Sequence, residues 1–196
     1  MKQHLSPTDW IQAAFRALTT GGPQAIRAER IARTLKVSKG SFYWHFKDVP
    51  ALKQAMLDHW QRVATQDVID LVEAGTSDAR GRLHLLVRVS TTLPDNTYGG
   101  DLAEAAIRDW ARYDPAAAKA VKAIDGKRLE FVNSQFRALG FDERQSLQRA
   151  RILYAALIGL HQLAHYGLSE PGNDLAVLLD DLLAPWEAGV TDPHTG

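Results

Sequence analysis

The segment from Lys39 to Lys47 carries hydrogen-bond donors and aromatic side chains in close succession. It reads Lys39-Gly40-Ser41-Phe42-Tyr43-Trp44-His45-Phe46-Lys47. Polar side chains of these types can donate hydrogen bonds to phosphates and base edges, and an exposed aromatic face can contact a thymine methyl group or a sugar. The chemistry that the segment favours is therefore noncovalent binding of a nucleic acid.

A second candidate for chemistry is the stretch His161-Gln162-Leu163-Ala164-His165. Two histidines four residues apart on a helix could both face one zinc ion, as in zinc proteases. Gln162 stands where that motif has its general-base glutamate, and the sequence offers no evident third ligand. A metal-dependent hydrolase is therefore kept only as an alternative. The sequence predicts no catalytic residue, no metal site and no cofactor, and it lacks a nucleophile elbow, a phosphate loop and a glycine-rich nucleotide motif.

Aromatic and histidine side chains recur through the later part of the chain, and such residues are typical of small-molecule pockets. They are equally typical of helical cores, so a place in the core is the alternative for each of them. The candidate ligand-binding residues are Trp60, His84, Tyr98, Trp110, Phe131, Tyr154, His161 and His165, with Phe136 and Tyr166 beside them.

The elements that must position these residues are helices, because the hydrophobic periodicity is helical nearly throughout and no convincing strand alternates. Ser6 is predicted to cap the first helix, with Pro7 and Asp9 in its first turn, and Gly21-Gly22-Pro23 ends it. Its apolar stripe is Trp10, Ile11, Ala14, Phe15 and Leu18. Further helices are expected at about residues 27–35, 39–46, 49–74, 79–93, 102–113, 115–139, 142–166 and 173–186, with a loop at 94–100.

One long helix is predicted over residues 49–74. Residues 75–78 are expected to break it and to cap the helix that follows. Its inner side is traced by Leu52, Met56, His59, Val63 and Leu71 or Val72.

Residues 27–46 are predicted to form a helix-turn-helix, because only three residues separate two short helices. Ser38 is placed to cap the second helix, whose amide end then favours a nearby phosphate. The apolar residues that can form a core between the two helices are Ile31, Ala32, Leu35, Val37, Phe42 and Phe46. Since a helix cannot bury all five residues of the aromatic run, Tyr43, Trp44 or His45 must face outward, which is unfavourable unless something binds there.

The segment from Ile31 to Leu52 contains Ile31-Ala32, Val37-Ser38, Gly40 to Lys47 and then Ala51-Leu52. This pattern resembles the DNA-binding domain of the tetracycline-repressor (TetR) family. The resemblance covers about Pro7 to Leu57, and the remaining two thirds are similar only in being helical with an aliphatic last pair. It implies an all-α fold, in which an N-terminal three-helix helix-turn-helix domain binds DNA. A C-terminal helical domain is expected to bind a small-molecule effector and to dimerise.

The resemblance also implies roles for individual residues. Lys39, Gly40 and Ser41 lie where family members touch base edges, and Lys39 is expected to donate to guanine. Tyr43 and His45 are similar to positions that hold phosphates or adjacent bases, and Trp44 offers an apolar face. Ala28 and Glu29 match further DNA contacts. The expected phosphate clamps are Arg27, Arg30, Arg33 and Lys47.

Two residues depart from the family pattern. Lys36 stands in the turn where the family usually has glycine, and a left-handed conformation there would cost roughly 1–2 kcal/mol. Val49 stands where the family tends to have a basic phosphate anchor at the start of the next helix. Backbone amides are expected to replace that anchor, or the affinity for DNA is lower.

The distribution of charge agrees with a DNA-binding N-terminal region. The whole chain has a net charge of zero, which alone would argue against a nucleic-acid-binding protein. Residues 1–60 hold nine lysines and arginines against four acidic residues, a net charge of +5, so the remainder carries −5. A basic region joined to an acidic one is typical of a DNA-binding domain attached to a domain that does not touch DNA. Chance clustering is the alternative.

Homodimerisation is expected, because one short recognition helix reads too few bases for a unique site. The candidate interface residues are Ala155, Ala156, Gly159, Leu163, Leu175, Leu178, Leu179, Leu182, Leu183 and Trp186. The alternative for this set is an intramolecular core. Periodicity alone does not separate the two, and the family resemblance favours the dimer.

Together these observations predict a two-domain transcriptional regulator, more plausibly a repressor than an activator, since steric exclusion of polymerase needs no activating surface. The expected division is residues 1–50 for DNA binding, 51–190 for effector binding and dimerisation, and 191–196 as a frayed tail. The chain lacks cysteine and an apolar leader or membrane span, so a cytoplasmic protein is expected. A helical interaction protein that does not read DNA remains an alternative, which the salt dependence of DNA binding would separate.

Overall fold

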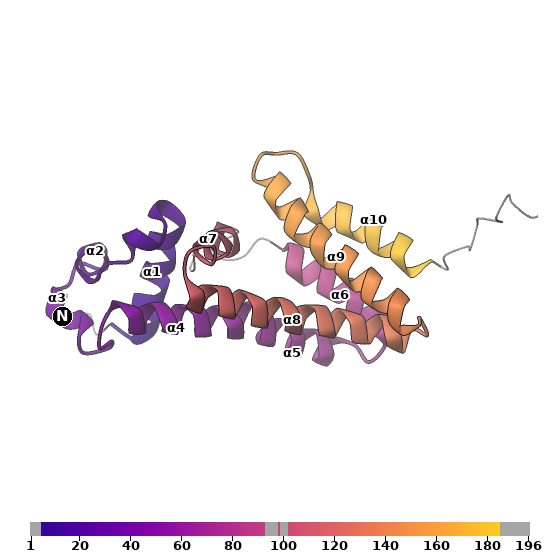
Figure 1. Ribbon diagram of the computed structural model, residues 1–196, viewed down its shortest axis with the longest axis horizontal. Coiled ribbons are helices and arrows are strands. Elements are labelled where there is room, and N and C mark those ends of the chain that lie inside the picture. The colour runs from indigo at the N-terminus through magenta and orange to yellow at the C-terminus, as the bar shows by residue number, and fades with distance from the viewer. Residues whose placement is uncertain (1–4, 93–97, 99–101, 185–196) are drawn as a thin grey trace, which may run out of the picture.

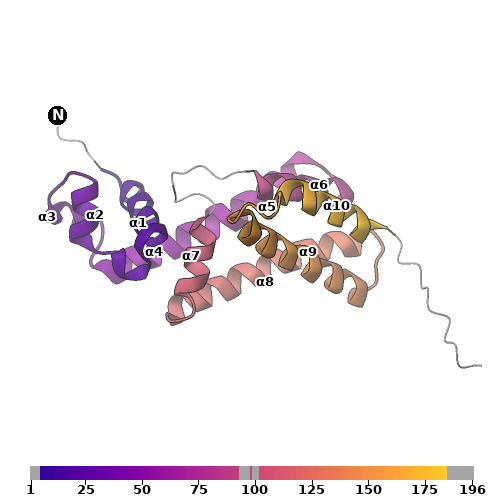
Figure 2. The same cartoon turned by 90° about the horizontal axis from the view of Figure 1, so that it is seen from above.

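The computed structural model describes residues 5–92, 98 and 102–184, and over these residues it contains helices and no strand. The predicted all-α class is therefore confirmed. The molecule is elongated, with α1–α3 at one end and α6, α9 and α10 towards the other (Figures 1 and 2). We call α1–α3 the head and the helices from α5 to α10 the body. Helix α4 leads from one to the other.

The head forms as its sequence predicts. Helix α1 (Pro7–Gly21) begins with a complete capping box, in which the backbone N of Asp9 donates to Ser6 Oγ and the backbone N of Ser6 donates to Asp9 Oδ2. A short 3₁₀ turn (Pro23–Ala25) leads into α2 (Ala28–Thr34). The predicted apolar stripe of α1 is buried throughout.

Helix α3 (Lys39–Phe42) is shorter than the expected 39–46. The chain keeps coiling beyond Phe42, but with tighter three-residue hydrogen bonds, from Tyr43 N to the Gly40 carbonyl (3.2 Å) and from His45 N to the Phe42 carbonyl (3.0 Å). Such bonds are common in the last turn of a helix. Residues 39–46 therefore form one compact coil that includes the aromatic run, although only the first half of this coil, Lys39–Phe42, is α-helix.

The turn between α2 and α3 places Lys36 in the left-handed region, with φ of 56°. Val37 N donates to the Ala32 carbonyl and Lys36 N to the Arg33 carbonyl, the bond pattern of a Schellman motif. The same pattern ends α8 at Gly140 (φ 92°) and α9 at Gly167 (φ 70°). Lys36 therefore adopts the left-handed conformation whose cost the sequence analysis considered, and a lysine occupies a position that the other two turns give to glycine.

Replacing Lys36 by glycine should therefore raise the free energy of unfolding by about 1 kcal/mol, because the β-carbon strain of the left-handed conformation disappears. Urea denaturation of the two proteins would measure this difference. Lys36→Ala removes the same charge but keeps the β-carbon, so it serves as the matched control. Equal stability of the glycine and alanine variants would contradict the argument.

The predicted long helix consists of α4 (Val49–Gln61), a π-helical turn (Arg62–Gln66) and α5 (Asp67–Gly75). The π turn changes which residues face inward, because the buried positions step by five residues from Trp60 to Thr65. The expected inner positions Leu52, Met56 and Val72 are buried, and His59 is half-buried. Of the alternatives Leu71 and Val72, it is Val72 that faces inward, whereas Val63 is exposed and its predicted inward orientation was wrong.

The body is built from α6 (Ala79–Thr91), α7 (Leu102–Trp110), α8 (Pro115–Ala138), α9 (Glu143–Ala164) and α10 (Pro171–Leu183). Asp78 caps α6 by accepting from Gly81 N (2.7 Å), as expected from the break before it. Helix α8 packs along α9, and α10 packs on α9 and α6. The predicted loop at 94–100, apart from Tyr98, lies outside the described residues, as do Trp186 and the tail at 191–196.

One apolar core runs from the head into the body. It joins Trp10 and Phe42 of the head to Ile107 and Trp110 of α7 and to Ile124 of α8. A second core, formed by α6, α8, α9 and α10, lies farther from the head. The division at residue 50 stays a prediction, because side chains from both sides of it share the first core. None of the described helices has the length and apolar character needed to cross a membrane.

Candidate functional site

The first candidate site is the outer side of the coil that follows Ser38. Phe42 is fully buried against Trp10, with their ring centroids 5.4 Å apart, and it stacks on Phe46 at 5.8 Å. These contacts anchor the inner side of the coil in the head. We call the outer side, formed by Lys39, Gly40, Tyr43, Trp44 and Lys47, the recognition face, because all five residues are exposed.

The recognition face exposes two large aromatic side chains next to each other. Trp44 is 88% exposed and Tyr43 is 57% exposed, whereas Phe42 and Phe46 are buried. His45 is half-buried, with its ring 6.3 Å from that of Trp10. The prediction that part of the aromatic run must face outward is confirmed.

Lys39 is not free on the recognition face. Its Nζ lies 2.6 Å from Glu29 Oε1 of α2, and both side chains are exposed. The hydrogen bond to Glu29 raises the pKa of Lys39, and the reciprocal bond lowers the pKa of Glu29. Any donation by Lys39 to a base would therefore have to break or share this ion pair.

The remaining residues expected to contact DNA are placed differently from one another. Arg27, Arg30, Arg33 and Ser38 are exposed, and Ser41 is half-buried. The expected DNA contact of Ala28 has to be corrected, because this residue is 6% exposed and belongs to the first core. Ser38 occupies the N-cap position but its hydroxyl makes no capping bond, so the predicted side-chain cap was wrong. Instead, the Ser38 carbonyl accepts from Ser41 N (3.0 Å).

At the start of α4, the backbone amides of Ala51 and Leu52 already donate to Asp48, and Pro50 has no N–H to offer a phosphate. Asp48 is the N-cap, and its Oδ1 accepts from Ala51 N (2.8 Å). A carboxylate at this helix end repels a phosphate, so the alternative of a weaker anchor at this point is favoured.

The second candidate site is a cavity of about 1210 Å³ between the head and the body. Its lining comes from α1, α4, the π turn and the helices from α5 to α10, together with Tyr98. The predicted ligand-binding residues that line it are Trp60, Tyr98, Tyr154, His161 and His165, with Tyr166 beside them. That these residues bind a ligand stays a prediction.

The other predicted ligand-binding residues do not line the cavity. His84 lies between α6 and α10, with Nε2 3.8 Å from Asp180 Oδ1. Trp110 belongs to the first core, and Phe131 packs with Ile69 and Val72. Phe136 is fully buried in the second core. For Trp110, Phe131 and Phe136 the core interpretation, which the sequence left open, is the correct one, whereas His84 is exposed and lies neither in a core nor on the cavity.

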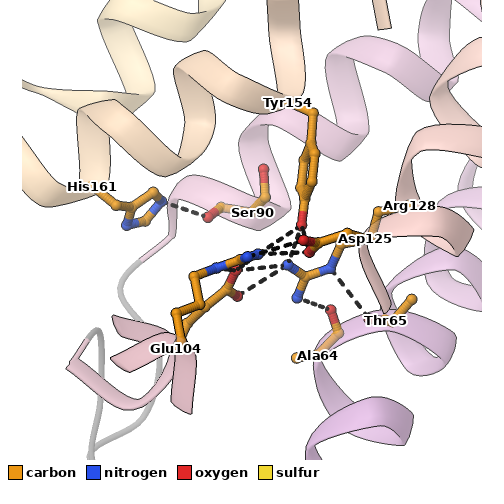
Figure 3. Close-up of polar contacts among 9 residues, drawn as sticks. Ala64, Thr65, Ser90, Glu104, Asp125, Arg128, Tyr154 and His161 are labelled. Carbon is orange, nitrogen blue, oxygen red and sulfur yellow. Dashed lines mark hydrogen bonds and ion pairs between the residues drawn. The ribbon is translucent and has the colours of Figure 1, made fainter. Parts of the chain in front are cut away.

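The cavity wall and the residues directly behind it contain a cluster of four charged residues that sequence reasoning missed. We call Glu104, Arg108, Asp125 and Arg128 the charge cluster (Figure 3). Arg128 Nη1 donates to both oxygens of Glu104 (2.9 and 3.0 Å), and Arg108 donates to Glu104 and to both oxygens of Asp125. The hydroxyl of Tyr154 donates to Asp125 Oδ1 (2.6 Å) and accepts from both guanidiniums.

Arg128 also holds the π turn. Its Nη2 donates to the Ala64 carbonyl (2.9 Å) and its Nε to Thr65 Oγ1 (3.2 Å) (Figure 3). A π turn has no regular α-helical hydrogen bonds, so an outside donor for one of its carbonyls stabilises it. The charge cluster is thus bonded directly to the π turn, which follows the helix that leads to the head.

The surroundings of the charge cluster shift the pKa values of its members. Burial alone raises the pKa of Glu104, but the guanidiniums of Arg128 and Arg108 outweigh it and hold the pKa below the ordinary value. Burial raises the pKa of Asp125 as well, but the hydrogen bonds from Arg108 and Tyr154 outweigh this effect and lower the pKa. Burial, with smaller effects from the neighbouring carboxylates, raises the pKa of Tyr154 to about 12. Both carboxylates are therefore ionised and the phenol is neutral at pH 7.

The raised pKa of Tyr154 predicts a loss of stability in alkali. The pKa of Tyr154 in the folded protein, about 12, exceeds the ordinary 10.0. The contribution of the neutral phenol to the free energy of unfolding is therefore complete below pH 10 and is lost as the pH rises to about 12. Two pKa units correspond to about 2–3 kcal/mol. Urea denaturation across this interval should show that loss in the natural protein and a smaller loss in Tyr154→Phe, which cannot ionise. Identical losses would contradict the assignment.

The histidine pair does not form a metal site among the described residues. His161 Nε2 lies 3.1 Å from the Ser90 carbonyl, so this nitrogen already has a partner (Figure 3). Within residues 5–92, 98 and 102–184, no three histidine or acidic side chains are grouped to hold a metal ion. The hydrolase alternative gains no support from this geometry.

The described residues predicted for a dimer interface divide into three groups. Leu175, Leu179 and Leu183 are buried in the second core, so the intramolecular interpretation holds for them. Ala156, Leu178 and Leu182 are partly buried against the same core. Ala155, Gly159 and Leu163 are exposed on α9.

Comparisons with known proteins extend these observations. Residues 11–56 match the family model described as bacterial regulatory proteins, tetR family. The sequence matches no curated protein. The fold is similar to a TetR-family transcriptional regulator from Streptomyces coelicolor, with a TM-score of 0.74 at 18% identity, covering 91% of this chain and 89% of that one.

Two further solved structures share the fold. A TetR transcriptional regulator from Legionella pneumophila has a TM-score of 0.74 at 16% identity, with 92% of this chain and 98% of that chain covered. A transcriptional regulator from Saccharomonospora viridis, solved in complex with choline, has a TM-score of 0.72 at 16% identity, with 90% and 94% covered. The likeness to these regulators therefore includes the body as well as the head.

Proposed function

We propose that this chain, which belongs to the TetR family by residues 11–56 and by its fold, is a repressor that leaves its operator when a small molecule fills the cavity. Residues 1–50 would bind DNA, and two copies would read a pseudo-palindrome. Such a regulator acts in the cytoplasm, where the chromosomal DNA lies. The family and fold are those of transcriptional regulators rather than enzymes.

The proposal that this chain binds DNA is supported above all by the composition and exposure of the recognition face. Trp44 is almost fully exposed although tryptophan strongly favours burial, and Lys39 and Lys47 lie on the same face. Exposed aromatic groups between cations suit the apolar and anionic parts of a major groove. A surface that only needed to be soluble would gain nothing from this combination.

Dimerisation is supported by the outer side of α9. Ile152, Ala155, Gly159 and Leu163 follow each other at helical spacing and are exposed, and a β-carbon at Gly159 would meet no other atom within 4 Å. An apolar stripe with small residues at its centre allows another helix to approach closely. A second copy of this chain is the partner that the proposal assigns to it.

Leu163→Glu should convert the dimer into a monomer at micromolar concentration, because it places a charge in the stripe where the two subunits would meet. Analytical ultracentrifugation measures the change. Ala118→Glu, which adds the same charge at an exposed position of α8, is the matched control and should remain dimeric. A natural protein that is already monomeric would contradict the proposed dimer.

Release of DNA is supported by the bonds between Arg128 and the π turn that follows α4. The structural neighbour from Saccharomonospora viridis was solved with choline, which supports a small-molecule ligand for this chain as well. Here Arg128 joins the cavity wall to the π turn that follows α4. If DNA binds the altered arrangement of this turn less well, a ligand that prefers that arrangement must, by linkage, weaken the binding of DNA.

Selection of bound duplexes from a random library tests the proposed function. The expected product is a pseudo-palindromic sequence whose binding weakens steeply with salt but keeps its preference over a scrambled duplex. Enrichment of no sequence would favour the alternative of an interaction protein that does not read DNA. Enrichment of a single half-site would retain DNA binding but contradict the dimer.

A further inference from the structure

The charged side chains that line the cavity already have ionic partners. Glu104 pairs with Arg128 and Arg108, and Arg108 also pairs with Asp125 behind the wall. Asp109 and Arg112, which are strongly exposed, pair with each other at 3.8 Å. Among the described residues of the lining, no aspartate, glutamate or arginine is without an opposite charge.

The two guanidiniums of the charge cluster also make several hydrogen bonds each. Arg128 uses Nε, Nη1 and Nη2 on Thr65, Glu104 and the Ala64 carbonyl, and Arg108 uses the same three nitrogens on the two carboxylates and Tyr154. Two guanidiniums and two carboxylates sum to zero charge. A charged ligand group would therefore find no counterion in the wall unless it broke one of these pairs.

Among the described residues that line the cavity, a buried polar atom without a hydrogen-bond partner is found on a neutral side chain. Nε2 of His59, a lining residue, is buried without a hydrogen bond. Its Nδ1 lies 3.4 Å from Arg62 Nη2, and because arginine only donates, Nδ1 accepts and Nε2 carries the proton. Burial, with a smaller effect of Arg62, lowers the pKa of His59, so the ring is uncharged at pH 7.

The rest of the lining is largely apolar. Aromatic rings come from Phe15, Trp60 and Tyr98, and aliphatic side chains come from α5, α6 and α9. The volume of about 1210 Å³ exceeds the usual range of about 300–1,000 Å³ for ligand pockets. The cavity can therefore bury a large apolar molecule, whereas burying an unpaired charge there would be strongly unfavourable.

We propose that the ligand of this cavity is an uncharged, predominantly apolar molecule, and that the self-neutralised charge cluster excludes organic anions and cations. The inference rests on the proposed function, since it names the chemical class of the effector. Recognition then depends on apolar contact and on neutral polar groups, rather than on a salt bridge to Glu104 or Arg128.

A pair of fluorescent probes that differ only in one sulfonate group tests this inference. N-phenyl-1-naphthylamine is neutral, and 8-anilino-1-naphthalenesulfonate is its anionic counterpart. The natural protein without DNA should bind the neutral probe at least about tenfold more tightly than the anionic one. Equal or tighter binding of the anionic probe would overturn the proposal.

Glu104→Gln should reverse part of this preference. It leaves Arg128 without its carboxylate while Arg108 keeps Asp125, so the cluster gains one positive charge. The affinity ratio of the two probes should shift towards the anionic probe by about fivefold or more. No shift in a variant with the helical circular dichroism of the natural protein would show that the cluster does not set the preference. If the variant does not fold, the comparison on the natural protein still decides the proposal.

Leu157→Trp locates the bound probe, because the larger side chain occupies part of the cavity that Leu157 lines. Binding of the neutral probe should weaken severalfold, and unchanged binding would place it elsewhere and contradict the assignment. These measurements use no DNA. Failure of operator selection would therefore leave the ligand class standing, and failure of the probe test would leave DNA binding intact.

Discussion

Replacing Lys39 by alanine is expected to weaken binding to a selected operator by about 1–3 kcal/mol per half-site and to reduce discrimination against a scrambled duplex. Lys39 lies at the start of α3 on the recognition face, where its ammonium group can donate to guanine. Fluorescence anisotropy with both duplexes at one fixed salt concentration measures the two effects. Weaker binding to both duplexes by the same factor would assign Lys39 to a phosphate instead.

Glu29→Gln is the informative companion to this variant. It removes the carboxylate that lies 2.6 Å from Lys39 Nζ, and so frees the lysine without changing the length of either side chain. If the ion pair competes with DNA, this variant should bind every duplex more tightly. Unchanged discrimination in Lys39→Ala, together with unchanged affinity in Glu29→Gln, would remove both residues from the DNA contact.

Arg128→Met is expected to lower the free energy of unfolding by about 2–4 kcal/mol, because a mostly buried arginine disappears from the charge cluster. The Ala64 carbonyl and Thr65 Oγ1 lose their donor at the same time. The side chain of Glu104 remains one-third exposed, so water offsets part of the loss. Urea denaturation monitored by circular dichroism measures the effect.

The double variant Arg128→Met, Glu104→Gln is the matched control. It removes one positive and one negative charge, so the pair of Arg108 and Asp125 remains neutral. Most of the lost stability should return if the penalty comes from an uncompensated charge, whereas a double variant as unstable as the single one would assign the penalty to packing around the π turn.

Much of the head could be predicted from the sequence, because its signals are local. The capping box at Ser6 and Asp9 and the left-handed turn at Lys36 each depend on a few neighbouring residues. The burial of Phe42 and Phe46, with Tyr43 and Trp44 outside, follows from the geometry of any helix. The confirmed family resemblance rests on the same short segment.

The features that the sequence did not predict depend on residues far apart in the chain. Glu104 and Arg108 are four residues apart, and this spacing signals an ion pair, but Arg128 and Tyr154 join them only because α7, α8 and α9 meet. The core positions of Leu175, Leu179 and Leu183 could not be separated from an interface by periodicity, since both environments favour leucine. Ala28 was misplaced because alanine tolerates either surroundings.

The π turn fixes the angular relation between the head and the body. In a regular α-helix, five residues advance by about 140° beyond a full turn, so Trp60 and Thr65 would face different sides. The wider turn brings both to the buried side while the two axes remain joined. The backbone of Arg62–Gln66 therefore sets the rotational angle at which each head would meet the DNA. A change of one residue in the winding of this turn would rotate the head about the helix axis rather than only bend it.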